Sequence, residues 1–348
     1  MVERQQSPRV AETEADGVTR YDLDGIRAYR IPVESFPKHI TNVYLVLGRK
    51  EATLIDVGFN SEKARADLLG GFATVKRAFG EDAGLSDVGS IVITHGHGDH
   101  FAMLAYEGLK GRRVYMSPLD SAVVTDYQRE YFRWRDYLQV LVNEAGCTVD
   151  FGGLYAYDEI PMKSGDYDLI GVSDGERVVD GYEVIGTPGH SPGHICIRVQ
   201  STLFLGDHML SLTTPHQVPR TGWGGVGLRP YLLSLDKVAE LDMALGLPAH
   251  EDTIYSVRGR AEEIKRFHFQ RLDELVGLCA REKSLYELTD QYYLRHPELI
   301  QASSVDRLVV EDFILALEEI KAHLEFLVDN GRLVSSAGSN GVVRYKSR

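Results

Sequence analysis

The chain has 348 residues, 43% hydrophobic and 26% charged, which is the composition of an ordinary globular protein. The formal net charge is −13, nearly all of it before residue 257, and this acidity argues against a general nucleic-acid-binding surface. There is no membrane-length apolar run, no secretory signal and no CxxC pair among three scattered cysteines, so we expect a cytoplasmic protein without disulfides or membrane contact.

The first third of the chain predicts strands followed by a helix and further strands. Residues 1–18 predict a disordered polar tail. Residues 20–57 alternate between polar and apolar side chains and predict a strand meander, whereas residues 60–79 predict a helix. The short apolar runs at 90–93 and 112–116 predict buried strands.

A polar motif, Thr-His-Gly-His-Gly-Asp-His, follows the strand predicted at 90–93 and spans residues 94–100. His95 and His97 are two positions apart, so in an extended segment both imidazoles point the same way. Asp99 and His100 fall where a helix is expected to begin, a position that favours a carboxylate. The motif therefore predicts ligands for two neighbouring metal ions, either zinc, iron or manganese.

Residues 119–175 form a predicted helical and loop insertion whose first half is rich in aromatic residues, including Tyr131 and Trp134. Two interpretations stay open for it. The segment is either a lid over a substrate cleft or an extra pair of helices that packs its aromatic side chains away.

Strands return in the middle of the chain, at 176–187, 194–199 and 202–206, followed by a loop at 211–230 and a helix at 231–245. Three further candidate ligands stand where strands end: His190 in a Gly/Pro-rich turn, Asp207 after a Gly, and His250 after a short late strand. Alternating strands and helices predict sheets covered by helices, with ligands gathered along one sheet edge.

A domain boundary is expected near residue 256, between a catalytic domain over 19–256 and a smaller domain over 257–348. The smaller domain has amphipathic helices predicted at 258–282, 285–293 and 306–330, followed by a short hairpin. Helices followed by a hairpin predict a winged-helix-like domain.

The ordered motifs HxHxDH, TPGHSPGH, a strand ending in Gly-Asp, and a late strand-end His resemble those of the metallo-β-lactamase superfamily. The resemblance implies an α/β fold, the αββα sandwich. It implies that His95, His97 and His190 hold a first metal, that Asp99, His100 and His250 hold a second, and that Asp207 bridges them. Asp56 matches an early acidic position that orients a ligand loop.

Two bound divalent ions, expected to be zinc with iron or manganese as alternatives, would make a metal-bound hydroxide available for attack on a carbonyl or phosphoryl centre. Asp99 is expected to orient this nucleophile and to carry its proton. His194 and His208 stand next to ligand positions, and either a supporting role or a plain structural role is open for them.

The leading hypothesis is hydrolysis of a small or medium acyl ester, above all a thioester of the acyl-CoA or acylglutathione type. Candidate substrate contacts are Tyr131, Trp134, His216, Trp223 and Arg229. One alternative is a single-strand endoribonuclease, suggested by the winged-helix resemblance, although the acidic chain makes a poor partner for RNA. Another is a persulfide dioxygenase with one iron. The appended helical domain is compatible with a homodimer.

Overall fold

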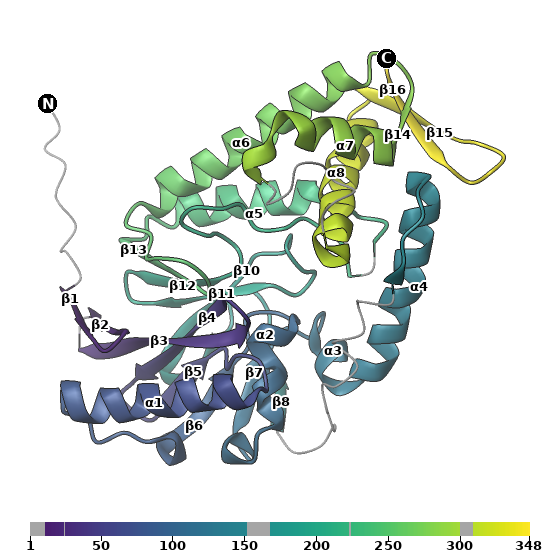
Figure 1. Cartoon of the computed structure of the whole chain (residues 1–348). Coiled ribbons are helices and arrows are strands. Elements are labelled where there is room, and N and C mark those ends of the chain that lie inside the picture. Colours follow the sequence, from purple (N-terminus) through teal and green to yellow (C-terminus); the bar gives the residue numbers. More distant parts are fainter. Residues whose placement is uncertain (1–10, 24, 152–167, 223, 300–308) are drawn as a thin grey trace, which may run out of the picture.

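The structure is a computed structural model that describes residues 11–23, 25–151, 168–222, 224–299 and 309–348. Two sheets lie face to face between helices (Figure 1). The first sheet has the order β1 (Ala11–Ala15), β2 (Val18–Leu23), β3 (Ile26–Phe36), β4 (His39–Leu47), β5 (Ala52–Ile55), β6 (Val88–Val92), β7 (Arg113–Met116) and β8 (Asp168–Gly171). The second has the order β13 (Leu245–Pro248), β12 (Thr202–Gly206), β11 (Ile195–Val199), β10 (Tyr182–Gly186) and β9 (Arg177–Val178).

The two faces of the first sheet are buried against different layers, because successive side chains of a strand point to opposite faces. Tyr44 and Val46 of β4 point inward and pack with Phe204 of β12 in the core between the sheets. Val43 and Leu45 point the other way and pack with helix α1 (Glu62–Phe79). The predicted αββα sandwich is confirmed.

Helices α5 (Leu228–Glu240) and α6 (Val257–Leu278) cover the outer face of the second sheet (Figure 1). Shorter and connecting helices are α2 (Gly98–Phe101), α3 (Ser121–Thr125), α4 (Tyr127–Ala145) and the 3-10 turns η1 (Leu85–Asp87), η2 (Ala102–Ala105), η3 (Glu107–Leu109), η5 (Val179–Gly181) and η6 (Pro297–Leu299). In the part of the chain that the structure describes, no helix combines the length and apolar character that crossing a membrane requires.

The predicted C-terminal helical region is present. It contains α6, α7 (Leu285–Arg295) and α8 (Val310–Asp329), with a small sheet of β14 (Lys283–Ser284), β16 (Val343–Ser347) and β15 (Leu333–Ala337). One hydrophobic cluster runs from Leu205 of β12 through Leu235 of α5 and Leu275 of α6 to Leu317 of α8. The expected boundary at residue 256 therefore separates two segments that share a continuous core.

Two segments that we expected to be irregular contain strands. The prediction of a disordered tail over 1–18 is wrong from Ala11 onward, because β1 pairs with β2 there. The two strands are joined by a turn at Asp16 and Gly17, which both have positive φ. Residues 1–10 lie outside the described residues. The loop expected over the second half of the 119–175 insertion contains β8, which adds a parallel edge strand to β7; residues 152–167 are likewise outside the description.

Candidate metal centre

The histidine-rich motif lies directly after β6, at the edge where the parallel strands of the first sheet end. Asp56 follows β5 at the same edge. Its carboxylate accepts hydrogen bonds of 2.8 Å from both the backbone N–H and the hydroxyl of Thr94, and it lies 2.9 Å from His100 Nδ1. These bonds fix the start of the motif and leave His100 Nε2 facing the other candidate ligands, so Asp56 is positioned to support a metal-binding loop.

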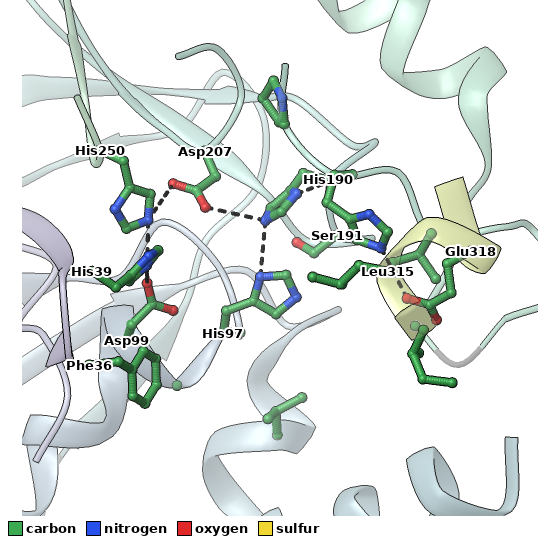
Figure 2. Close-up of a pocket in the computed structure, with 18 of the residues that line it drawn as sticks. Phe36, His39, His97, Asp99, His190, Ser191, Asp207, His250, Leu315 and Glu318 are labelled. Carbon is green, nitrogen blue, oxygen red and sulfur yellow. Dashed lines mark hydrogen bonds and ion pairs between the residues drawn. The ribbon is translucent and has the colours of Figure 1, made fainter. Parts of the chain in front are cut away.

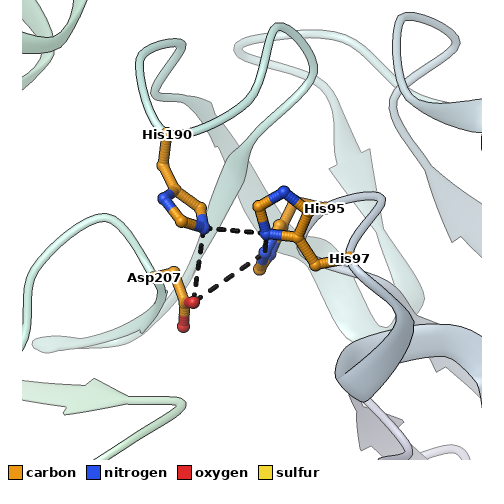
Figure 3. Close-up of side chains that lie close together, drawn as sticks. All are labelled: His95, His97, His190 and Asp207. Atoms are coloured by element: carbon orange, nitrogen blue, oxygen red, sulfur yellow. Dashed lines mark hydrogen bonds and ion pairs between the residues drawn. The ribbon is translucent and has the colours of Figure 1, made fainter. Parts of the chain in front are cut away.

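The second sheet supplies the other three candidate ligands from loops at its facing edge. His190 lies between β10 and β11, Asp207 follows β12, and His250 follows β13. Figure 3 shows His190 and Asp207 pointing toward His95 and His97, which come from the opposite side of the site. The seven residues that the sequence singled out are thus brought together at one place.

One cluster of donor atoms is formed by His95, His97, His190 and Asp207, here called the three-histidine group. His97 Nδ1 lies 3.0 Å from both His95 Nε2 and His190 Nε2. Asp207 Oδ2 lies 3.4 Å from His190 Nε2 and 3.9 Å from His95 Nε2. Three imidazole nitrogens and a carboxylate oxygen that face one another are a donor set suited to zinc or another divalent transition metal.

A second cluster, here called the Asp99 group, contains Asp99, His100 and His250. Asp99 Oδ2 lies 3.4 Å from His100 Nε2 and 3.3 Å from His250 Nε2. Asp207 reaches this group too, because its Oδ1 is 3.4 Å from His250 Nε2 and its Oδ2 is 3.6 Å from His100 Nε2 (Figure 2). The Asp207 carboxylate therefore lies between the two groups.

Two buried polar atoms indicate that the side chains of these two groups are suited to binding metal ions. His100 Nε2 and Asp207 Oδ1 are both buried and make no hydrogen bond within the described residues. A buried polar atom without a partner is unfavourable unless something satisfies it. A cation between the donor atoms would do so for both at once.

The histidines of the two groups differ in their protonation. Burial and the neighbouring His190 lower the pKa of His97 to about 3, so its imidazole is neutral, the form that binds metals. Burial also acts to lower the pKa of His250, but the charges and hydrogen bonds of Asp207 and Asp99 together raise that pKa to about 10. In the metal-free protein the Asp99 group therefore carries protons that a metal would displace.

His194 contacts the backbone of a candidate ligand, whereas His208 contacts the core. His194 Nε2 accepts a 3.0 Å hydrogen bond from the backbone N–H of Asp207, which fixes the start of that loop. The preceding Gly206 has φ 51°, and a Cβ there would lie 2.7 Å from His194 Nε2, so glycine is required. The His208 ring packs against Tyr231, with 5.5 Å between ring centroids, and its carbonyl accepts a hydrogen bond from the Tyr231 hydroxyl.

Two functional candidates were not predicted from the sequence. Asp120, after β7, is 4% exposed and accepts hydrogen bonds from the backbone N–H groups of Gly96 and Gly193 and from the Ser191 hydroxyl. His39, at the start of β4, places Nε2 3.0 Å from Asp99 Oδ2, and its ring lies 4.4 Å from that of His250, centroid to centroid, at a tilted angle (Figure 2). The sequence offered one indication of Asp120, because this residue, like the candidate ligands, follows shortly after a strand.

The groups open into a cavity of about 1080 Å³ whose walls come from both halves of the chain. Of the candidate substrate contacts, Tyr131, Trp134 and His216 line this cavity. Arg229 does not: its guanidinium bonds to Asn330 Oδ1 at 2.9 Å and covers the Phe326 ring, because α5 turns it toward the C-terminal region. Trp223 lies outside the described residues.

Helix α4 has features of both interpretations of the 119–175 insertion, the lid and the packed helix. Its first half presents Tyr131 and Trp134 to the cavity, while Leu138 and Leu141 of its second half are buried in the core shared with the C-terminal helices. Helix α8 contributes another part of the wall through Leu315 and Glu318 (Figure 2).

Several known proteins resemble this chain in sequence and in structure. The chain is 28% identical over 271 residues to a probable metallo-hydrolase, YqjP, of Bacillus subtilis, covering 71% of this chain and 77% of that protein. It is 25% identical to the lactamase-like protein adaB of Aspergillus niger, over 85% of this chain and 76% of the relative. The crystal structure of the metallo-beta-lactamase family protein TTHA1429 from Thermus thermophilus superposes with a TM-score of 0.74 at 26% identity, covering 92% of this chain and 98% of that one.

A second solved structure, a beta-lactamase domain protein from Burkholderia ambifaria, has the same fold, with a TM-score of 0.71 over 99% of this chain and 96% of that one. Its identity is 22%. The family model of the metallo-beta-lactamase superfamily matches residues 37–250, which is more than half of the chain and includes every candidate ligand. The chain therefore belongs to the metallo-beta-lactamase superfamily.

Proposed function

We propose that this protein is a hydrolase that uses two divalent metal ions to cleave a small or medium acyl ester, with a thioester as the leading candidate. The observation that carries the proposal is the position of Asp207. Its two carboxylate oxygens lie within 3.4 to 3.6 Å of nitrogen atoms from both donor groups, so one side chain joins two adjacent metal sites.

In this proposal His95, His97 and His190 hold one ion and Asp99, His100 and His250 hold the other. Bound together, two such ions supply a hydroxide nucleophile at neutral pH and stabilise negative charge that develops on the substrate. Zinc fits the mixture of imidazole and carboxylate donors, and iron or manganese would accept the same set. Asp99 lies at the cavity surface, where its carboxylate is placed to orient the nucleophile and to accept its proton.

The cavity supports an acyl substrate with little charge. Its walls carry Phe36, Trp134, Val309 and Leu315. Among the described lining residues, Lys38 is the single lysine or arginine. Phosphates and carboxylates of a ligand usually bind basic side chains. Within the thioester hypothesis we therefore favour an apolar acyl group on a small or uncharged leaving group over coenzyme A or glutathione conjugates.

The test offers zinc-loaded protein a panel of acyl esters and thioesters that differ in acyl length and in the charge of the leaving group. We expect release of alcohol or thiol, fastest for uncharged apolar substrates. His95→Ala should abolish it, whereas His296→Ala, which removes a histidine outside the cavity, should not. Equal, near-background release by the wild type and His95→Ala on every substrate would contradict the proposal.

Two alternative functions, the endoribonuclease and the persulfide dioxygenase, can be tested by separate measurements. The C-terminal elements follow one another in the order of a winged-helix module, and we propose that they form one: α6, β14, α7, α8, β15, β16. Its helix α8 presents Asp312 and Glu318 to the cavity, an unfavourable surface for RNA, so we expect no binding of single-stranded RNA at physiological salt. A persulfide dioxygenase would contain one iron per chain, which metal analysis distinguishes from two ions.

A further inference from the structure

Helix α8 of the C-terminal region binds the loop between β12 and α5 through a series of carboxylates. Glu318 Oε2 lies 3.0 Å from His216 Nε2. Glu319 Oε2 accepts a 2.8 Å hydrogen bond from the backbone N–H of Gln217. About two helical turns further along α8, Glu325 bonds to Thr221. The loop is therefore attached to α8 at two places along the helix.

The same loop contacts a candidate metal ligand. His190 Nδ1 donates a hydrogen bond of 2.9 Å to the backbone carbonyl of His216. A proton on Nδ1 leaves Nε2 free of one, and Nε2 is the atom that faces His97 and Asp207. A carbonyl that accepts from the outer nitrogen of a metal-binding histidine fixes both the tautomer and the ring orientation.

The position of Glu319 is fixed by its contact with Arg271 of α6. Both side chains are buried, at 6% and 4% exposure, and they form an ion pair. Arg271 also donates to the Tyr292 hydroxyl at 3.1 Å, and its guanidinium lies over the rings of Phe267 and Tyr292. Burial acts to raise the pKa of Glu319, but the charge of Arg271 together with His216 and His323 holds it well below its usual range, so Glu319 stays ionised.

We infer that Glu319, anchored by Arg271, is a positioning residue for the metal centre. It fixes the backbone of residues 216 and 217, and the carbonyl of His216 in turn orients the imidazole of His190. The C-terminal region would then determine how tightly the three-histidine group binds its ion, although it contributes no ligand to that group. This inference rests on the proposed metal centre.

The test replaces the buried pair with apolar residues, Arg271→Met together with Glu319→Leu, because such exchanges preserve folding better than removal of one charge. Glu319→Gln is the second variant, which keeps the shape and removes the charge. Metal affinity is measured by chelator competition on folded, full-length protein, with the absorption spectrum of bound Co²⁺ as a report on ligand geometry. The matched control is Glu274→Gln, which removes an ion pair to Arg295 and His296 elsewhere in the same region.

We expect the double variant to bind one of the two ions about 10- to 100-fold more weakly, with an altered Co²⁺ spectrum, while the other ion and the control remain as in the wild type. Glu319→Gln should give a smaller loss in the same direction. Wild-type affinity for both ions in a folded variant would overturn the inference. So would equal weakening of both ions together with a lower melting temperature, which indicates a merely structural pair. A wild type that binds no metal would instead contradict the proposed function.

Discussion

The carboxylate of Asp120 accepts a 2.7 Å hydrogen bond from the backbone N–H of Gly193, in the loop that carries His190. The other oxygen of Asp120 accepts from Gly96, between His95 and His97, and Gly193 follows shortly after His190. A Cβ at residue 193 would lie 2.6 Å from Asp120 Oδ1, so the approach requires a glycine. Loops from two different sheets are thus held in register by one buried side chain.

Asp120→Asn should weaken metal binding by the three-histidine group about 10- to 100-fold, because the amide nitrogen would face N–H donors that now bind an oxygen. Chelator competition measures the change. Asp136→Asn is the matched control, since Asp136 is exposed on α4. Wild-type affinity in Asp120→Asn would show that the loops hold their positions without this bond.

Metal binding should release protons. Burial acts to lower the pKa of His250, but the charges and hydrogen bonds of Asp207 and Asp99 together raise it to about 10. His250 is therefore protonated at neutral pH in the metal-free protein and must lose that proton to bind a metal. Affinity should therefore rise with pH between about pH 6 and about pH 9. Calorimetric titration in buffers of different ionisation enthalpy counts the protons. A pH-independent affinity over this range would contradict the assignment of His250.

His216 should make folding stability depend on pH. Burial acts to lower its pKa, but hydrogen bonds to Glu318 and Glu319 raise it from 6.5 to about 9. Because the pKa is raised in the folded state, the stabilisation is complete below about 6.5 and is lost as the pH rises through about 9. The contribution is on the order of 3 kcal/mol, since one pKa unit corresponds to about 1.4 kcal/mol.

Urea unfolding at acidic and alkaline pH measures this effect as a difference between the wild type and His216→Gln. The two proteins should differ most at the lower pH and converge above the folded pKa. A difference that stays constant across the range would mean that His216 does not change its charge there.

Trp134→Ala should reduce the use of long apolar acyl groups by removing part of the cavity wall. We expect KM for such substrates to rise about tenfold with kcat little changed, because the contact is made equally in ground and transition states. Short acyl substrates should be affected less. Val140→Ala, at an exposed position of the same helix, is the control. A loss confined to kcat would place Trp134 close to the reacting atoms instead.

The sequence predicted those parts of the molecule that depend on local patterns. The strand meander and the helix at 60–79 follow from periodicity, and the ligand motifs stand at strand ends where turn residues mark them. The Asp16–Gly17 dipeptide is a hairpin signal as well, yet its polar surroundings suggested a tail.

Contacts between distant segments could not be predicted in the same way. His216 and Glu318 are 102 positions apart, and Asp120 and Gly193 are 73 apart. Nothing in the local pattern of either residue indicates its partner, because the approach results from packing of α8 and of the two sheets. Arg229 was misplaced for the same reason: its partner Asn330 lies 101 positions away.

The number and identity of the metal ions bound per chain decide whether this protein has a dinuclear centre. Elemental analysis by mass spectrometry of the dialysed, metal-loaded protein measures both. We predict two divalent ions per wild-type chain, because Asp207 lies between two complete donor groups. A single iron per chain, or no bound metal, would contradict this prediction.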